Sequence, residues 1–200
     1  MAREYATRFS DELRHKPLDC ELLRRFAIEV AGRGPVYDLG CGPGQTTAFL
    51  HELGVPVRGL DLSPAFVAEA RRRHPGIDFM VGDMLSLPIS DAALGGAVAF
   101  YSIVHLSDDQ LQLAFAEMFR VLRKDGRLLL AFHVGHGPVH VDEFLGQPLS
   151  ADFMFFDAVS VAADLAVAGF AQIEIVERDP YPGIEFQSRR AYVFASKYAP

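Results

Sequence analysis

The stretch "VYDLGCGPGQTTAFL", Val36–Leu50, decides which fold this chain can adopt. It opens with a short apolar run that predicts a buried strand, and it closes with the apolar spacing of a helix. Glycines at 40, 42 and 44 stand between the two, and they let the backbone turn tightly and approach a bound molecule closely. A strand, a glycine turn and a helix in this order are typical of an α/β sandwich with a parallel sheet.

The same alternation of strand and helix continues along the chain. Apolar runs predict strands at 35–40, 55–63, 77–83, 95–103, 127–134, 171–177 and 191–197. Helical spacing, caps and glycine stops predict helices at 20–31, 45–54, 63–74, 107–126 and 157–169. No helical pattern separates the last two strands, so we expect them to be antiparallel neighbours. The sequence therefore predicts one domain over residues 1–200. Its expected fold is a Rossmann-like three-layer α/β sandwich with a mostly parallel seven-stranded sheet and one antiparallel strand near the C-terminus.

Composition limits the classes of function. The chain has 200 residues, 50% of them hydrophobic, and a net charge of −7, which disfavours nucleic acid as a partner. Cys20 and Cys41 match no disulfide or zinc pattern, the N-terminal stretch is charged, and the apolar runs are short for a membrane span. We therefore expect a soluble cytoplasmic protein with no nucleic-acid or membrane partner. The sequence does not give its oligomeric state.

Acidic residues stand where the first three strands end, the edge at which such sheets bind ligands. Asp38 heads the glycine turn, where a carboxylate suits an ammonium group better than a pyrophosphate. Asp61 ends the second strand some 20 residues further on, the position from which a carboxylate accepts ribose hydroxyls. Asp83 ends the third strand and could accept an exocyclic amine, with Met84 lying on an adenine face.

These motifs resemble those of the class I S-adenosylmethionine-dependent methyltransferases. The resemblance runs from about Tyr5 to Lys197, in family order and spacing. The stretches that carry it are "VYDLGCGPGQTT", "GLDLSPAFVAEA", "FMVGDMLSLP", "AFYSIVHL" and "EMFRVLRKDGRLLLAF".

The resemblance implies S-adenosyl-L-methionine as cofactor. Gly40 and Gly42 would approach its methionine part, and the backbone around Phe100 and Tyr101 would accept its amino group. Residues 1–31 look like the helical lid segment that folds over the cofactor in this family. The candidate cofactor-binding residues are Tyr5, Asp38, Gly40, Cys41, Gly42, Asp61, Leu62, Gly82, Asp83, Met84, Phe100 and Tyr101.

Two histidines are candidate catalytic residues. Methyl transfer is an in-line displacement that needs a base only when the acceptor arrives protonated. His105 follows the fourth strand and could act as a base, enclose the sulfonium or simply pack in its loop. His133 ends the fifth strand and could face the transferring methyl group. His136 and His140 lie further out, and the glycines and proline among them disfavour a helix that would converge the three on a metal, so we expect no metal site.

Acceptor selectivity is expected from residues 133–156, which read as a long structureless loop. Its phenylalanines would suit an apolar or aromatic small-molecule acceptor, although any one of them could anchor the loop on the core. They are Phe144, Phe153, Phe155 and Phe156. The fourth strand lacks the Asn/Asp-Pro-Pro-aromatic pattern of methyltransferases that act on nucleobase amino groups, which again points away from DNA.

Two other functions stay open from the sequence. A nicotinamide-dependent Rossmann oxidoreductase shares the glycine turn and the ribose carboxylate, but the Gly-x-Gly-x-Gly spacing and the Gly82–Met84 stretch count against it. A non-catalytic module that binds S-adenosylmethionine would carry the same cofactor motifs.

Overall fold

The computed structural model of the protein describes residues 2–8, 12–144 and 146–198. Its helices are α1 (Ala2–Arg8), α2 (Pro17–Val30), α3 (Gln45–Glu52), α4 (Pro64–Arg73), α5 (Asp108–Val121) and α6 (Ala158–Val167), together with the short 3-10 helices η1 (Glu12–His15) and η2 (Ile103–His105). Its strands are β1 (Val36–Leu39), β2 (Val57–Asp61), β3 (Phe79–Val81), β4 (Leu94–Phe100), β5 (Leu122–His133), β6 (Gly137–Phe144), β7 (Gln147–Phe155), β8 (Ala171–Arg178) and β9 (Arg190–Ser196).

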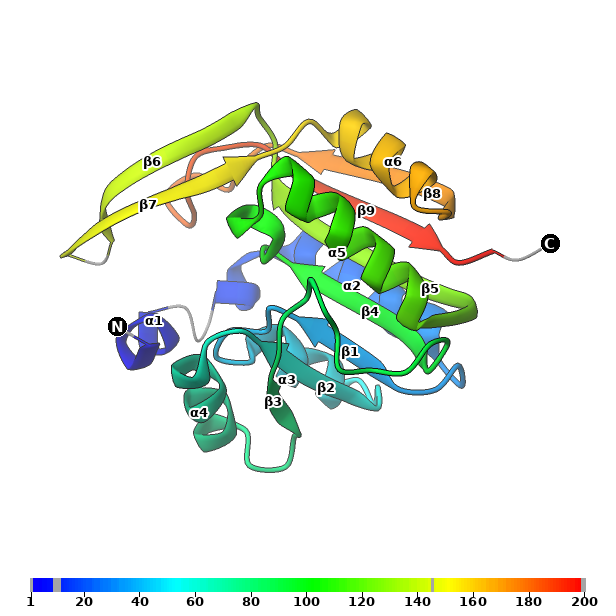
Figure 1. The fold of residues 1–200 in the computed structure, drawn as a ribbon. Coiled ribbons are helices and arrows are strands. Elements are labelled where there is room, and N and C mark those ends of the chain that lie inside the picture. Colours follow the sequence, from blue (N-terminus) through cyan, green and yellow to red (C-terminus); the bar gives the residue numbers. More distant parts are fainter. Residues whose placement is uncertain (1, 9–11, 145, 199–200) are drawn as a thin grey trace.

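Within the described residues, seven strands form one sheet in the order β3-β2-β1-β4-β5-β9-β8 (Figure 1). Strands β1 to β5 pair in parallel, whereas β9 runs antiparallel to both β5 and β8. The predicted fold class and the single antiparallel strand are therefore confirmed. The strand order reverses between β1 and β4, and a sheet of this kind binds its ligand at that switch point.

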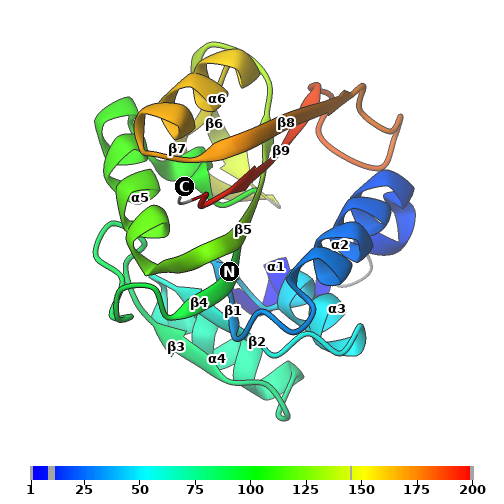
Figure 2. The ribbon, with the colours of Figure 1, turned by 90° about the vertical axis from the view of Figure 1, so that its right-hand side faces the viewer.

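Helices cover both faces of the sheet, as Figure 2 shows. Leu128 and Leu130 on β5 pack on one face with the buried residues of α5 and α6. Leu129 and Ala131, which alternate with them, pack on the other face with α2 and α3. Because both faces are buried, the strand is a continuous apolar run and not an alternating one.

Local capping explains where the helices begin. The Ser63 hydroxyl accepts a hydrogen bond from the Phe66 amide ahead of α4. Ser107 and Gln110 form a reciprocal capping box at the start of α5. Helix α5 ends at Val121, so the predicted end at Gly126 is wrong. Leu122 already has extended backbone angles and begins β5.

The segment predicted as a structureless loop is a β-hairpin, so that prediction is also wrong. Strands β6 and β7 pair antiparallel as a separate two-stranded sheet. Gly146, with φ of +74°, lies in the connection, which needs a left-handed backbone conformation. Figure 1 shows the hairpin reaching out beyond the main sheet.

The N-terminal segment is helical where it is described, and α1 lies beside α4. The Arg73 guanidinium donates to the Thr7 hydroxyl at 3.1 Å. The role of residues 1–31 as a lid stays a prediction. None of the helices in the described residues combines the length and apolar character that crossing a bilayer requires.

Candidate functional site

The glycine turn after β1 is held tightly against its neighbours. The Gly40 and Cys41 amides donate to the Leu60 carbonyl at 2.7 and 3.0 Å. A Cβ placed on Gly40 would lie 2.3 Å from Ser102 Cβ and 3.2 Å from Met84 Cε. At this turn, the three segments that follow β1, β3 and β4 lie close together. They can do so only because residue 40 has no side chain.

Asp61 joins the end of β2 to this turn. Its Oδ2 accepts the Gly42 amide at 2.8 Å, and its Oδ1 accepts the Ser63 amide at 2.8 Å. Each carboxylate oxygen has a second lone pair. The half-buried carboxylate is thus fixed in place and can still accept hydroxyl groups of a bound ligand.

Asp38 lies beneath the turn and is buried. The Thr47 hydroxyl donates to its Oδ2 at 2.6 Å. Burial nevertheless raises the pKa of Asp38 to about 7, and the nearby charge of Asp61 adds to this rise. Burial thus favours the protonated form of this carboxyl group, and its contact with an ammonium group stays a prediction.

The raised pKa of Asp38 predicts a pH-dependent stability. An unfolded Asp38 loses its proton near pH 3.8, whereas the folded one keeps it to about 7. The folded state binds the extra proton between these values, so its stability falls as the pH rises through this window. We expect Asp38→Asn to remove this fall in urea unfolding curves, and Asp78→Asn, on an exposed carboxylate, to leave it. Parallel curves for wild type and Asp38→Asn would contradict the assignment.

The chain beyond β3 and β2 supplies an open apolar surface beside the turn. The Asp83 carboxylate accepts the Leu85 amide at 2.9 Å and closes the bend after β3. Gly82 lies against Leu60, where a Cβ would be 2.7 Å from its side chain. Leu62, which follows β2, is 69% exposed.

Tyr101 follows β4 with a left-handed backbone, at φ of +57°. Its amide donates to the Ala131 carbonyl at 2.8 Å, and its ring packs edge-on against Phe100. A non-glycine residue held in this conformation is strained, and such strain clusters at ligand sites.

A buried charged cluster behind Tyr101 was not predicted from the sequence. The fully buried Asp19 accepts hydrogen bonds from Tyr101, Tyr192 and Arg178. Arg178 also pairs with Glu185, which in turn pairs with Lys16 and Arg190. These groups come from three separated parts of the chain, residues 16–19, Tyr101 and residues 178–192, so no local spacing signals them. The cluster fastens α2 to β8 and β9 at the same edge as the glycine turn.

His133 and His105 both lie at this edge, next to the hairpin. The His133 ring stacks on the Phe155 ring with 4.8 Å between ring centroids, and it packs edge-on against the Tyr101 ring with 5.7 Å between centroids. Burial lowers the pKa of His133 to about 3, with Arg190 and Lys16 adding to the effect. The His105 ring lies 5.2 Å from Phe153, and desolvation lowers its pKa while the charge of Asp61 opposes this.

The remaining histidines of this region point elsewhere. His136 is exposed, and the exposed His140 hydrogen-bonds Asp152 and Asp142 on the hairpin. The described residues contain no group of three or more His, Cys, Asp or Glu side chains arranged to hold a metal. Phe156 is buried against Phe132 and anchors the hairpin.

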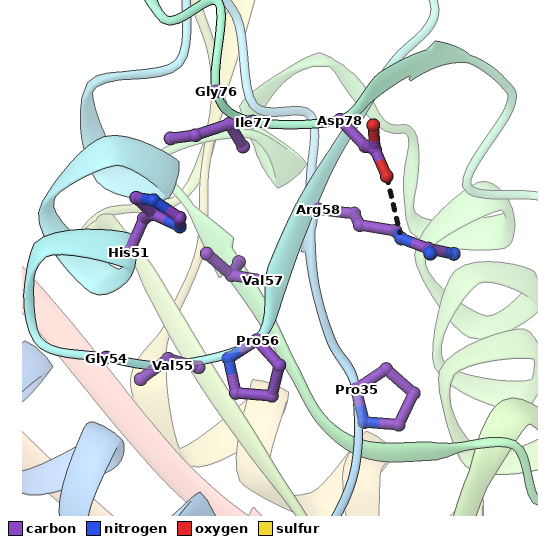
Figure 3. A pocket seen from close by; sticks show the side chains of 10 residues that line it. All are labelled: Pro35, His51, Gly54, Val55, Pro56, Val57, Arg58, Gly76, Ile77 and Asp78. Atoms are coloured by element: carbon purple, nitrogen blue, oxygen red, sulfur yellow. Dashed lines mark ion pairs between the residues drawn. The ribbon is translucent and has the colours of Figure 1, made fainter.

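A hollow of about 500 Å³, whose lining residues Figure 3 shows, lies at the opposite edge of the sheet from the glycine turn. It is lined by residues at the amino ends of the first strands, among them Pro35, Val57 and Asp78. Ligands of parallel sheets bind at the carboxyl ends, so this hollow is not the predicted site.

Comparison with known proteins agrees with this geometry. The family model described as a methyltransferase domain matches residues 36–126. A probable S-adenosylmethionine-dependent methyltransferase of Mycolicibacterium smegmatis is 39% identical over 54% of this chain and 41% of its own. Residues 36–126 of this chain are therefore similar in sequence to a methyltransferase domain.

Two further proteins are similar to this chain, one in sequence and one in fold. A trans-aconitate 2-methyltransferase of Methylobacterium nodulans is 40% identical over 50% of this chain and 39% of its own. A solved S-adenosylmethionine-dependent methyltransferase of Methanosarcina mazei superposes with a TM-score of 0.74 at 18% identity, over 83% of this chain and 93% of its own. The chain spans about half the length or less of the first curated relatives that it matches.

The methyltransferase fold thus brings most of the predicted cofactor residues to one edge. Those whose surroundings are described above are Asp38, Gly40, Cys41, Gly42, Asp61, Leu62, Gly82, Asp83, Met84, Phe100 and Tyr101. Tyr5 belongs to α1, but its side chain lies outside the described residues, as does that of Phe144. The individual roles of these residues stay predictions.

Proposed function

We propose that this domain transfers the methyl group of S-adenosylmethionine to a small-molecule acceptor. The observation that carries the proposal is the fixed Asp61 carboxylate, whose Oδ2 lies 2.8 Å from the Gly42 amide at the carboxyl edge of the sheet, beside the switch point. A cofactor with a ribose would lie on Asp61, with its methionine part along the glycine turn toward Asp38. Leu62 and Met84 would flank its adenine. When bound there, the cofactor supplies an electrophilic methyl group, and the protein supplies orientation and exclusion of water.

The acceptor would enter between the carboxyl edge of the sheet and the hairpin. Aromatic rings meet there from three segments, with Phe186 from the β8–β9 connection lying 6.0 Å from both His133 and Phe155. Phe186 is 57% exposed, so this aromatic group is open to the outside. Such a surface supports an acceptor with an apolar or planar portion. The net charge of −7 supports an acceptor other than nucleic acid.

The comparisons support a small acceptor as well. The relative from Methylobacterium nodulans is named for trans-aconitate, and others of similar identity are named for malonyl-[acyl-carrier protein]. We extend the general class, a small or carrier-presented molecule, to this chain.

Calorimetry and a methyl-release assay test the proposal. We expect S-adenosylmethionine to bind and NAD not to bind, because the glycine spacing and the Gly82–Met84 stretch suit the former. Binding of NAD alone would favour the oxidoreductase. Binding of S-adenosylmethionine without transfer to any acceptor of a broad panel would favour the non-catalytic module.

His105 gives a separate prediction for the methyl-transfer step. Its ring packs on Phe153 near the charge of Asp61, so it borders the place where cofactor and acceptor would meet. We expect His105→Ala to lower turnover roughly tenfold while the cofactor affinity changes little. His136→Ala, at an exposed histidine before the hairpin, is the matched control. Equal turnover of the two variants would assign His105 a packing role.

A further inference from the structure

A short relay of hydrogen bonds determines which nitrogen of His133 carries the proton. The Ser188 hydroxyl lies 2.7 Å from Nδ1 of His133 and also accepts a hydrogen bond from the Arg190 guanidinium. Arg190 is 2% exposed and is held further by the Ser188 and Phe186 carbonyls. The relay runs from β9 to the end of β5, directly behind the aromatic surface.

The chemistry of Arg190 fixes the direction of one of these bonds. A guanidinium can only donate, so the Ser188 oxygen is an acceptor toward Arg190. Within the described residues, Nδ1 of His133 is the group bonded to Ser188 Oγ that can accept the hydroxyl proton. With Ser188 donating to Nδ1, the proton of the neutral ring sits on Nε2.

Nε2 is the atom that this relay presents. In the described part of the chain it has no hydrogen-bond partner, and it is not among the fully buried unpartnered atoms, so part of its surface is accessible. Phe155 covers one face of the ring, and Tyr101 and Phe186 approach it edge-on. The open N–H thus stands alone among apolar rings, where a hydrogen bond to a ligand is strong.

We propose that His133 is a neutral hydrogen-bond donor to a carboxylate of the acceptor, and that Ser188 and Arg190 are its positioning residues. This assignment rests on the proposed methyl transfer and gives His133 a different role from the predicted one of facing the transferring methyl group. The groups that set the charge at the ring are Arg190 and Lys16, with Glu185 opposing them, and burial together with the two cations keeps the ring neutral. A cationic surrounding and an N–H donor both favour an anionic oxygen.

A carboxylate also removes the need for a base. One of its oxygens attacks the methyl carbon, the carbon–sulfur bond breaks, and its electron pair stays on sulfur. The products are a methyl ester and S-adenosylhomocysteine, and no proton is released. A hydroxyl or ammonium acceptor would have to lose a proton, and desolvation lowers the pKa of both His133 and His105, which weakens them as bases.

Nuclear magnetic resonance of the whole protein with isotope-labelled histidine tests the tautomer. We expect the His133 signals, assigned by their loss in His133→Gln, to show a proton on Nε2 and none on Nδ1. They should not titrate between about pH 5 and 8. Ser188→Ala should mix the two tautomers, and Ser188→Thr should restore the first. A proton on Nδ1, or titration near the ordinary value of 6.5, would overturn the relay.

Ligand titration in the presence of S-adenosylhomocysteine tests the acceptor class. Benzoate and cinnamate are expected to shift the His133 Nε2 proton, and benzamide and cinnamyl alcohol to leave it. The shift should survive in His136→Ala, the matched control. Equal responses to both kinds of probe, or none to either carboxylate, would overturn the carboxylate assignment. Calorimetry with S-adenosylmethionine and the methyl-release assay on the same samples separate the two failures, since the proposed function falls if the cofactor does not bind or if no acceptor is methylated.

Discussion

Gly40→Ala is expected to destabilise the domain by about 2–5 kcal/mol and to abolish cofactor binding. The new Cβ would lie 2.3 Å from Ser102 Cβ and 2.9 Å from its Oγ, and that hydroxyl donates to the Leu39 carbonyl at 2.6 Å. Overpacking of this kind costs about 1–3 kcal/mol, and a left-handed alanine costs about 1–2 more. Because Ser102 lies only two residues beyond the end of β4, any relief of the clash must move the end of a central strand. Urea unfolding and calorimetry measure the two effects.

Gly42→Ala is the matched control for this prediction. Gly42 also has a left-handed backbone, at φ of +53°, but a Cβ there would meet nothing within 4 Å. We expect Gly42→Ala to lower the free energy of unfolding only by the cost of a left-handed alanine, about 1–2 kcal/mol. Equal losses of stability for the two variants would show that the close approach to Ser102 does not constrain the turn.

Asp61→Ala is expected to weaken S-adenosylmethionine binding by about 100-fold. The change removes the acceptor proposed for the ribose and also frees the Gly42 and Ser63 amides that the carboxylate holds. Hydrogen bonds to a charged group contribute about 1.5–3 kcal/mol each, so the loss of the ribose contacts and a looser turn together account for this factor. Calorimetric titration at fixed salt measures the affinity.

Two variants sharpen the interpretation of Asp61. Asp78→Ala makes the same change of charge at an exposed carboxylate on the opposite edge of the sheet, and it should leave the affinity unaltered. Asp61→Asn keeps one acceptor oxygen and should fall between wild type and Asp61→Ala. If Asp61→Ala bound S-adenosylmethionine as tightly as wild type, the proposal that the ribose lies on Asp61 would be wrong.

The main sheet and its carboxyl edge could be predicted because their signals are local. Each central strand is a single apolar run that stops at a polar or glycine residue, as at Asp38–Gly40 and Asp61. Parallel strands align these stops at one edge, so an order of elements is enough to bring them together. The role of Ser63 as the N-cap of α4 could likewise be predicted, because it directly precedes Pro64.

The hairpin and the charged cluster were missed for different physical reasons. The hairpin strands carry mixed polar and apolar residues around Gly135, Gly137 and Gly146, which favour turns when taken singly. Pairing between β6 and β7 decides the outcome, and that pairing is a tertiary property. The cluster around Asp19 needs side chains from residue 178 onward, so only the folded sheet reveals it.

The place of β9 in the sheet has a consequence for how the protein is made. Strand β5 is synthesised before β9, although β9 is its neighbour on one side in the sheet. Likewise, Asp19 is synthesised long before Arg178 and Tyr192, which donate hydrogen bonds to its carboxylate in the folded protein. On the ribosome, the central sheet therefore emerges with the edge of β5 unpaired. The Asp19 carboxylate, which is buried in the folded protein, is then still exposed to water. Such an edge is prone to wrong pairing until the last strand arrives. Folding of the ligand edge is thus coupled to completion of the chain up to β9, and nascent chains that stop before Arg190 should depend on chaperones.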